Sequence, residues 1–291
     1  MLDVTRLRVL AAVARHGSVT AAAEALHYAQ PSVSHHLSRL EAETGACLVQ
    51  RVGRGVRLTP AGRLLAERAE EILGRLDAAE AELESLTGLT SGRVRLAAFP
   101  SALGSFVPLA AARFAASHPG VALSLVEAEP PEALRLLKAG EVDLAVVFDY
   151  AGGDPVPDDG VRLTPLFDEP LHLVTGLAET RDLAGLAGAR WIGGCERCRT
   201  SLVRRCAAAG FTPEIAFTTD DYVAVQALVA AGLGVTILPD LALRAHRSAG
   251  VRAQPLPGPG RRVTAALYGT PPDPPAPAAL LAALLATGPP A

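Results

Sequence analysis

One short segment of the sequence has side chains of the types and spacing that recognise DNA. If a helix begins at Pro31, three apolar residues fall at i, i+4 and i+7 and form one stripe, namely Val33, Leu37 and Leu40. The polar residues that then point away from the stripe are Ser34, His35, Ser38 and Arg39. Small hydroxyls, an imidazole and a guanidinium can approach base edges, exchange hydrogen bonds and bind phosphates. The pattern therefore favours a helix that lies in a DNA groove.

A second helix must position this face, and the sequence before Pro31 supplies it. Ser18 is a suitable N-cap, and the segment up to Leu26 is rich in alanine, which lets two helices pack closely. Two such helices joined by a turn form a helix-turn-helix. The preceding segment, Leu2 to His16, has an apolar stripe that would cover both helices from behind. Periodicity alone leaves an ordinary helical hairpin with a solvated polar face equally open.

The run from Ala29 to Gly62 separates these two interpretations. Its sequence is AQPSVSHHLSRLEAETGACLVQRVGRGVRLTPAG. It resembles the DNA-binding domain of LysR-type transcriptional regulators in its Gln-Pro-x-x-Ser helix start, Arg-Leu-Glu centre, arginine-containing wing and Leu-Thr-x-x-Gly close, and the resemblance continues over nearly the whole chain. Two positions depart from the family pattern: Ala29 stands where a Ser or Thr cap is usual, and Val49 where Phe is usual. Losing a cap costs about 1 kcal/mol and leaves the binding face in place.

The resemblance implies a winged helix-turn-helix over residues 1–59. The segment Cys47 to Thr59 is expected to form a two-stranded wing, whose three arginines are spaced to reach phosphates or a minor groove. For any one of these arginines, plain surface solvation is an equally open alternative. The residues expected to contact double-stranded DNA are Gln30, Pro31, Ser32, Ser34, His35, Ser38, Arg39, Arg51, Arg54 and Arg57.

Residues 60–92 are expected to form a long linker helix and a hinge. From Pro60 to about Thr87, apolar residues recur at helical spacing with Gly74 as the one breaker. A helix this long and amphipathic needs a partner, and in the resembling family it dimerises. We therefore expect a homodimer, paired again as a tetramer, with four side chains buried against the second copy: Leu65, Ile72, Leu76 and Leu83. The alternative is a helix packed on its own C-terminal domain.

The pattern of residues 93–291 predicts an α/β domain. Strands and helices alternate as βαβαβ from Val94 to Phe148, which implies a parallel sheet with right-handed crossovers, and a second α/β unit follows. The resemblance implies an effector-binding domain similar to type 2 periplasmic binding proteins, with two subdomains that share two crossing strands. We place subdomain 1 at about 93–161 and 267–291, and subdomain 2 at about 162–266.

Three turns that follow strands are the candidate ligand-binding positions. Ligands of open α/β sheets bind beyond the carboxyl ends of the strands, often at helix N-termini whose N–H groups favour anions. The resemblance places these turns around an effector cleft, so an anionic or strongly polar small molecule is expected there. The expected contacts are Pro100, Ser101, Ala102, Cys195, Thr218 and Thr219. Ser101, Cys195 and Thr219 could each equally be a simple helix cap.

The CxxC motif of Cys195 and Cys198 could bind metal or respond to oxidants. A metal would need two more ligands, but Cys206 lies on the following helix and no histidine is close in sequence, so no metal is expected. A thiol at a helix N-terminus beside Arg197 and Arg199 would have a lowered pKa. A redox-sensing regulator is therefore the alternative function, although thiols that merely pack beside the cleft are favoured over it.

Composition supports the division into a DNA-binding end and a ligand-binding end. The chain has 291 residues and 49% hydrophobic content, enough for two or three domains. Met1 to Pro60 carries seven arginines and four acids, a net charge of +3, which leaves −6 on the remainder of a chain whose total is −3. The positive end is the end expected to meet DNA.

Other classes of protein find little support. No apolar run is long enough to span a bilayer, and the N-terminus lacks a secretory pattern, so we expect no membrane association and a cytoplasmic location. No nucleophile elbow, phosphate-binding glycine loop or metal-ligand cluster is present, so we expect neither catalysis nor a cofactor. A small-molecule binding protein or enzyme whose N-terminal helices serve only association is the remaining alternative.

Overall fold

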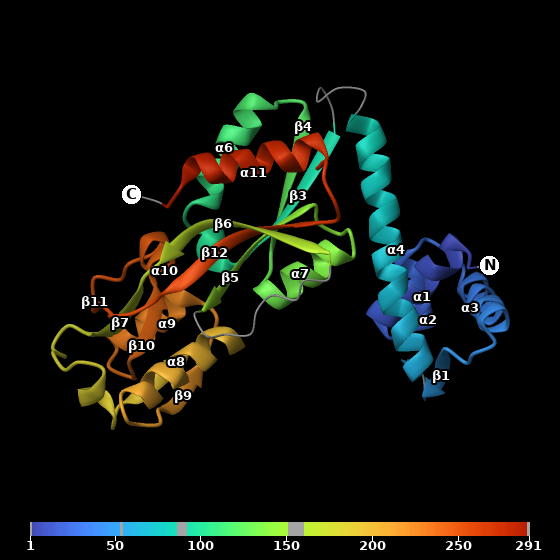
Figure 1. The fold of residues 1–291 in the computed structure, drawn as a ribbon. Coiled ribbons are helices and arrows are strands. Elements are labelled where there is room, and N and C mark those ends of the chain that lie inside the picture. Colours follow the sequence, from blue (N-terminus) through green and yellow to red (C-terminus); the bar gives the residue numbers. More distant parts are fainter. Residues whose placement is uncertain (1, 53–54, 86–91, 151–159, 290–291) are drawn as a thin grey trace. The chain divides into compact units, whose positions relative to one another are not determined.

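The computed structural model describes residues 2–52, 55–85, 92–150 and 160–289. The chain divides into two compact units, Met1–Leu86 with Leu136–Glu141, and Thr87–Arg135 with Val142–Ala291. Figure 1 shows an all-helical first unit with a small β-ribbon, and a second unit in which helices cover mixed β-sheets. The expected fold class, a winged helix-turn-helix joined to an α/β domain, is confirmed.

Three helices form the centre of the first unit: α1 (Val4–His16), α2 (Val19–Ala25) and α3 (Gln30–Thr44). Ser18 caps α2 by accepting a hydrogen bond from the N–H of Ala21 at 3.5 Å. Gly17 and Gly45 follow α1 and α3 with left-handed φ angles of 63° and 67°, which glycine adopts without strain. Ala29 is the N-cap residue of α3 and makes no capping hydrogen bond, because its methyl side chain has no acceptor atom.

The apolar stripe of α3 faces a shared core. Val33, Leu37 and Leu40 are 0%, 4% and 0% exposed, and they pack with buried residues of α1 and with Ala22 and Ala23 of α2. The alanines allow the close approach of α2, because a methyl group adds little bulk between two backbones. The polar side of α3 is thereby held outward on a rigid support.

The wing is a ribbon of β1 (Val49–Val52) and β2 (Gly55–Leu58), paired antiparallel. Glu41 of α3 holds its start, because one carboxylate oxygen accepts the N–H groups of Leu48 at 2.8 Å and of Val49 at 3.2 Å. The end of the wing is fixed by Thr59, whose hydroxyl donates a hydrogen bond to the carbonyl oxygen of Cys47. A side chain at Gly62 would lie 2.0 Å from the carbonyl oxygen of Leu48, so only glycine fits there.

The long helix α4 (Pro60–Ser85) has two apolar sides. One side packs on the core of the first unit through Ala66, Ala69 and Leu73. Leu65, which we expected at a dimer interface, also packs against this core. The other side is exposed in the single chain at Leu64 (58%), Ile72 (38%) and Leu76 (40%). The side chain of Leu83 lies outside the described residues.

The second unit contains a five-stranded sheet in the order β4-β3-β5-β12-β6. Its strands are β3 (Gly92–Ala98), β4 (Val121–Glu127), β5 (Leu144–Tyr150), β6 (Val161–Glu169) and β12 (Arg261–Tyr268). The first three are parallel, as predicted, and β12 is antiparallel to both β5 and β6. The helices that accompany this sheet are α5 (Pro100–Leu103), α6 (Val107–Ser117), α7 (Pro130–Lys138) and α11 (Pro275–Thr287). Its core includes four fully buried phenylalanines, Phe99, Phe106, Phe114 and Phe148.

A smaller group of strands forms subdomain 2. They are β7 (Leu171–Gly176), β8 (Arg190–Gly193), β9 (Glu214–Thr218), β10 (Thr236–Pro239) and β11 (Val251–Pro255). One sheet has the order β10-β7-β11, β8 pairs with β9, and a bridge from Trp191 to Val235 links the two groups. The accompanying helices are η1 (Ala184–Leu186), α8 (Glu196–Ala208), α9 (Tyr222–Ala230) and α10 (Asp240–Ala245).

Several expected boundaries differ from the structure. The strands β6 and β12 pair with each other along their length in the larger sheet, so subdomain 1 extends through Glu169 and resumes at Arg261. The boundaries drawn at 161/162 and 266/267 assign most of both strands to subdomain 2 and are wrong. The first helical segment after β3 is divided into α5 and α6, with residues 104–106 between them. The strand β11 was not expected, although its short sequence VRAQP alternates between apolar and polar residues.

Candidate functional site

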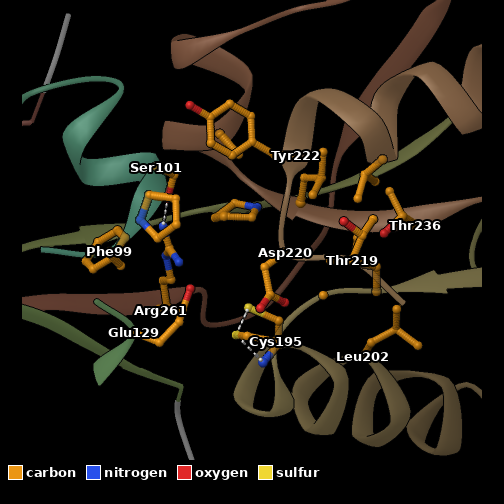
Figure 2. A pocket seen from close by; sticks show the side chains of 18 residues that line it. Phe99, Ser101, Glu129, Cys195, Leu202, Thr219, Asp220, Tyr222, Thr236 and Arg261 are labelled. Atoms are coloured by element: carbon orange, nitrogen blue, oxygen red, sulfur yellow. Dashed lines mark hydrogen bonds between the residues drawn. The ribbon is translucent and has the colours of Figure 1, made fainter. Parts of the chain in front are cut away.

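A pocket of about 570 Å³, its open mouth included, lies between the two subdomains of the second unit. Figure 2 shows side chains from both subdomains around it. Subdomain 1 contributes Phe99, Pro100, Ser101, Glu129 and Arg261. Polar contributions from subdomain 2 are Cys195, Cys198, Thr219, Asp220, Tyr222 and Thr236, with Leu202, Val225 and Ile237 among the apolar ones.

The structure brings together residues from all three predicted turns. Pro100 and Ser101 begin α5, Cys195 caps α8, and Thr219 follows β9, and all four line the pocket. The remaining two residues of the expected set do not line it. Ala102 is completely buried in the core of subdomain 1, and Thr218 is exposed at the end of β9.

A buried ion pair includes one of the lining residues, Arg261. Nε of Arg261 donates to Oε2 of Glu169 at 2.5 Å, and both side chains are 2% exposed. Nη2 of Arg261 donates to the Ser101 hydroxyl at 2.8 Å, and Oε1 of Glu169 accepts the N–H of Leu241 at 2.5 Å. Each charge is thus paired and hydrogen-bonded, as burial requires. The network joins α5, β6, β12 and α10, and it thereby connects the two subdomains where the crossing strands meet subdomain 2.

Two aromatic rings enclose the same guanidinium. Cζ of Arg261 lies 4.6 Å from the ring centroid of Phe99 and 4.3 Å from that of Phe148. The negative faces of the rings stabilise the cation, and the rings keep water away from it. Arg261 is consequently held in one position by neighbours that are themselves fully buried.

Glu129 carries a buried carboxylate oxygen that lacks a partner. It stands between β4 and α7, and its Oε2 atom is buried without any hydrogen bond among the residues that the structure describes. Burial raises the pKa of this carboxyl group, and hydrogen bonding with Cys195 and the charge of Arg261 oppose that rise. Figure 2 shows Glu129 and Arg261 on the same side of the pocket, with Asp220 across from them.

The two thiols of the CxxC motif lie in contact at the first turn of α8. Their Sγ atoms are 2.8 Å apart, and Sγ of Cys195 also accepts the N–H of Cys198 at 3.4 Å. Hydrogen bonding from Cys195, helped by Arg261 and Tyr150, lowers the pKa of Cys198, whereas the same bond and burial raise the pKa of Cys195. Both cysteines are free thiols, and the described residues include no group of three potential metal ligands.

The N-terminus of α9 already has a protein acceptor. The Asp221 carboxylate accepts the N–H of Val223 at 2.8 Å and of Ala224 at 3.2 Å, and the Thr219 hydroxyl accepts the N–H of Asp221 at 3.3 Å. Thr219 therefore acts partly as a local turn residue, the alternative raised for it, while it also borders the pocket.

The sequence did not indicate Glu129, Tyr222 or Arg261 as pocket residues, and Asp220 belongs to the third predicted turn without having been an expected contact. Arg261 and Glu169 are 92 positions apart, and only the strand register brings them together. Glu129 could have been found from the sequence, because it is an acid that follows the predicted second strand, at the same sheet edge as Ser101. Tyr222 reaches Gly104 in the other subdomain, where an added side chain would lie 2.5 Å from its hydroxyl.

The expected DNA-reading residues form a second candidate site on α3. Six of them are exposed beside the buried stripe, namely Gln30, Pro31, Ser32, His35, Ser38 and Arg39, and Ser34 is half-buried. The Ser34 hydroxyl accepts a hydrogen bond from Nε2 of Gln30 at 3.1 Å. In the wing, Arg57 is exposed, the side chain of Arg51 is not described, and Arg54 lies outside the described residues.

Comparison with known proteins identifies both units. Residues 4–63 match the family described as bacterial regulatory helix-turn-helix protein, lysR family, and residues 87–288 match the LysR substrate binding domain. An uncharacterized HTH-type transcriptional regulator of Bacillus subtilis, YcgK, is 32% identical over 270 residues, which cover 84% of this chain and 82% of that protein. A probable hydrogen peroxide-inducible genes activator of Streptomyces viridosporus is 32% identical over 285 residues, covering 91% and 88%.

A solved structure has the same fold over the whole chain. CbnR, a LysR family transcriptional regulator, superposes with a TM-score of 0.67 at 23% identity. The superposition covers 99% of this chain and 100% of the CbnR chain. No helix within the described part of this chain has the length and apolar character needed to cross a membrane.

Proposed function

The chain belongs to the LysR family of DNA-binding transcriptional regulators, and we propose that it responds to a small molecule bound in the pocket between its α/β subdomains. Its two matched regions are a helix-turn-helix domain of this family and a LysR substrate binding domain. The proposal assigns the effector contacts to Pro100, Ser101, Cys195 and Thr219. It assigns DNA contacts to the exposed side of α3 and to the wing arginines.

The observation that carries the proposal is the convergence of three separate turns on one pocket. Ser101 comes from subdomain 1, and Cys195 and Thr219 come from two different turns of subdomain 2. A ligand that touches both sides binds best at one subdomain spacing, so it shifts the population toward that spacing. The two DNA-reading domains of an oligomer would then be held differently.

A thermal-shift screen of the full-length protein tests this proposal. A compound that binds only the folded state raises the melting temperature by mass action. At a concentration 100 times Kd it stabilises the folded state by about 2.7 kcal/mol. We expect at least one class of small metabolite to do so in the wild type. The proposal fails if no metabolite of any class raises the melting temperature of a preparation that binds its own promoter DNA.

A redox signal is the second candidate, favoured by the 2.8 Å contact between the Cys195 and Cys198 sulfur atoms. In this version the Cys198 thiolate, whose pKa is lowered, attacks one oxygen of hydrogen peroxide. The O–O bond breaks, one oxygen leaves as water after taking up a proton, and Cys198 becomes a sulfenic acid. The Cys195 thiol then attacks that sulfur and releases the second water, so two thiols are oxidised and one peroxide is reduced.

Replacing Cys195 separates the two candidates. Cys195→Ser keeps the size and a hydroxyl at the pocket but cannot form the disulfide. Under the small-molecule proposal this variant retains most of its response to a bound metabolite. If instead peroxide changes the promoter affinity of the wild type and Cys195→Ser abolishes that change, the redox candidate replaces the first.

The proposal includes three finer points that follow from regulation of DNA. The pocket binds its ligand without chemical conversion, so the protein is not an enzyme. The protein acts in the bacterial cytoplasm, where promoter DNA is found. The oligomer is a dimer formed through α4 that pairs again as a tetramer, and light scattering at micromolar concentration measures both steps.

A further inference from the structure

The pocket offers fewer hydrogen-bond donors to an anion than its three turns suggest. The N–H groups at the start of α9 are already bound by the Asp221 carboxylate. At α8, the N–H of Cys198 is bound by the Cys195 sulfur. The helix α5 spans only Pro100–Leu103, too short for a helix dipole to matter.

The one cation in the pocket lining is also engaged. Arg261 donates Nε to Glu169 and Nη2 to Ser101, and its guanidinium lies between two phenylalanine rings. Its charge is balanced by Glu169, which is as deeply buried as Arg261 itself. The pair as a whole is neutral, so it attracts an anion weakly.

Two carboxylates remain, and they face the pocket from opposite subdomains. Oε2 of Glu129 is buried without a partner among the described residues, and Asp220 is an exposed lining residue on the other side. Figure 2 shows both beside the space between Arg261 and Cys195. With Arg261 and Glu169 cancelling, these two carboxylates determine the formal charge of the lining, which is negative.

A buried acceptor without a partner costs free energy that a ligand donor can recover. We propose that the pocket takes a small molecule with a protonated amino group, which donates to Oε2 of Glu129 and lies between Glu129 and Asp220. This inference rests on the proposed small-molecule function and names the class of effector. Apolar side chains such as Leu202, Val225 and Ile237 would enclose the carbon skeleton.

The proposed contact explains why Glu129 tolerates its position. The charges of Asp220 and Glu127 oppose ionisation of the Glu129 carboxyl group, whereas Arg261 and the hydrogen bond with Cys195 favour it. An ammonium group supplies both the missing hydrogen bond and the compensating charge. It also favours a closed spacing, because its two carboxylate neighbours belong to different subdomains.

The test compares matched probes on the full-length protein. 1,4-Diaminobutane, 4-aminobutanoate and succinate share four carbons and differ in whether each end is an amine or a carboxylate, and a wider panel of amines, amino acids, carboxylates and neutral metabolites is screened beside them. Melting temperatures are measured for the wild type, Glu129→Gln and Glu127→Gln, and Kd by calorimetry for every compound that raises the wild-type value. Glu127 is the matched control, since it is an exposed acid on the adjoining strand that does not line the pocket.

We expect amine-bearing compounds to raise the melting temperature of the wild type, and Glu129→Gln to weaken their binding about tenfold or more. Glu127→Gln should bind them within about twofold of wild type, because a solvent-exposed charge contributes little. Screening both amines and amino acids shows whether the ligand also carries a carboxylate.

Two results would overturn the inference and are distinguishable from failure of the proposed function. If carboxylates or neutral compounds bind and amines do not, the pocket is an effector site of another chemistry. If amines bind equally well to wild type and Glu129→Gln, the contact is wrong. If no compound of any class binds, the proposed function fails and the inference fails with it.

Discussion

Arg261 and Glu169 form an ion pair at the point where both crossing strands reach subdomain 2. The two residues are directly paired in the register of β12 and β6, and Nε of Arg261 lies 2.5 Å from Oε2 of Glu169. Because Arg261 also binds Ser101 and Glu169 also binds the Leu241 N–H, this pair links the pocket lining to the crossing strands β6 and β12 and to α10. A change in the spacing of the subdomains must therefore act on this network.

The first prediction concerns the stability of this pair. Glu169→Gln removes one charge and leaves the buried Arg261 unpaired, so we expect a loss of about 3–5 kcal/mol in the free energy of unfolding. Arg262 and Asp168 are the matched control, since they occupy the next register position and are 58% and 71% exposed. Asp168→Asn should cost less than about 1 kcal/mol. Urea unfolding of both variants measures the difference, and equal losses would contradict the assignment.

A second prediction follows from the raised pKa of Glu129. Burial is the main cause of the rise, so the folded protein binds this proton more tightly than the unfolded chain. Ionisation therefore destabilises the fold above the raised pKa, and this cost vanishes below the ordinary glutamate pKa of about 4.3. Glu129→Gln should be more stable than wild type near about pH 8, with the gain falling toward zero near about pH 4.

Urea unfolding at several pH values checks this dependence. Glu127→Gln provides the control, because Glu127 is exposed and should show no comparable gain at high pH. A pH-independent difference between wild type and Glu129→Gln would mean that the Glu129 carboxyl titrates normally.

The third prediction places the dimer interface on the exposed side of α4. Ile72 and Leu76 are 38% and 40% exposed in the single chain, and an aspartate at either position would bury an unpaired charge in the dimer. Ile72→Asp should give monomers at micromolar concentration by light scattering, with the helical content unchanged. Glu67→Lys is the control, since five positions turn a helix by about 140°. A dimer that survives Ile72→Asp would place the interface elsewhere.

The fourth prediction separates specificity from affinity in DNA binding. His35 is an exposed residue of α3, so His35→Ala should lose about 1–3 kcal/mol of discrimination at particular base pairs. Arg57→Ala in the wing should weaken binding to all duplexes similarly and reduce the salt slope by about 1. Anisotropy titrations at several salt concentrations with duplexes from the protein's own promoter measure both effects. The assignment is wrong if Arg57→Ala changes sequence preference and His35→Ala does not.

The fifth prediction uses two adjacent threonines. Thr219 lines the pocket and Thr218 does not, although the two are adjacent, with Thr218 the last residue of β9 and Thr219 directly after it. Thr219→Val should therefore weaken the response of DNA binding to ligand about fivefold or more, since a lost hydrogen bond costs roughly 1 kcal/mol. Thr218→Val should respond as wild type. Equal responses of the two variants would remove Thr219 from the effector contacts.

The helical part of the fold could be predicted because its signals are local. Ser18, Gly17 and Gly45 mark helix ends by side-chain and backbone chemistry that involves only near neighbours. The stripe of Val33, Leu37 and Leu40 identifies the buried side by spacing alone. These features give correct helices to within one or two residues.

The boundary between subdomains could not be read in the same way. The strands β6 and β12 belong to the larger sheet because they pair with each other and β12 pairs with β5, and pairing between segments about a hundred residues apart leaves no local pattern. The boundaries were therefore drawn near residues 161 and 267. In the structure subdomain 1 extends about eight residues further, to the end of β6, and resumes about six residues earlier, at the start of β12.

The pocket shows the same division between local and long-range information. Ser101, Cys195 and Thr219 could be named in advance because each follows a predicted strand, where ligands of open α/β sheets bind, and because the family resemblance places these turns around an effector cleft. Arg261 and Glu129 acquire their importance from burial and from partners distant in sequence. The expectation of an anion came from helix N-termini alone, without knowledge that Asp221 occupies one of them.

Promoter affinity measured with and without ligand tests the central claim most directly. The wild-type protein is titrated with a duplex from its own promoter region, in the absence and in the presence of the compound that most raises its melting temperature. We predict that the compound changes the dissociation constant for DNA by about 5–150-fold, and that Thr219→Val reduces this change while Thr218→Val does not. An identical dissociation constant with and without a compound that demonstrably binds the wild-type protein would contradict the account.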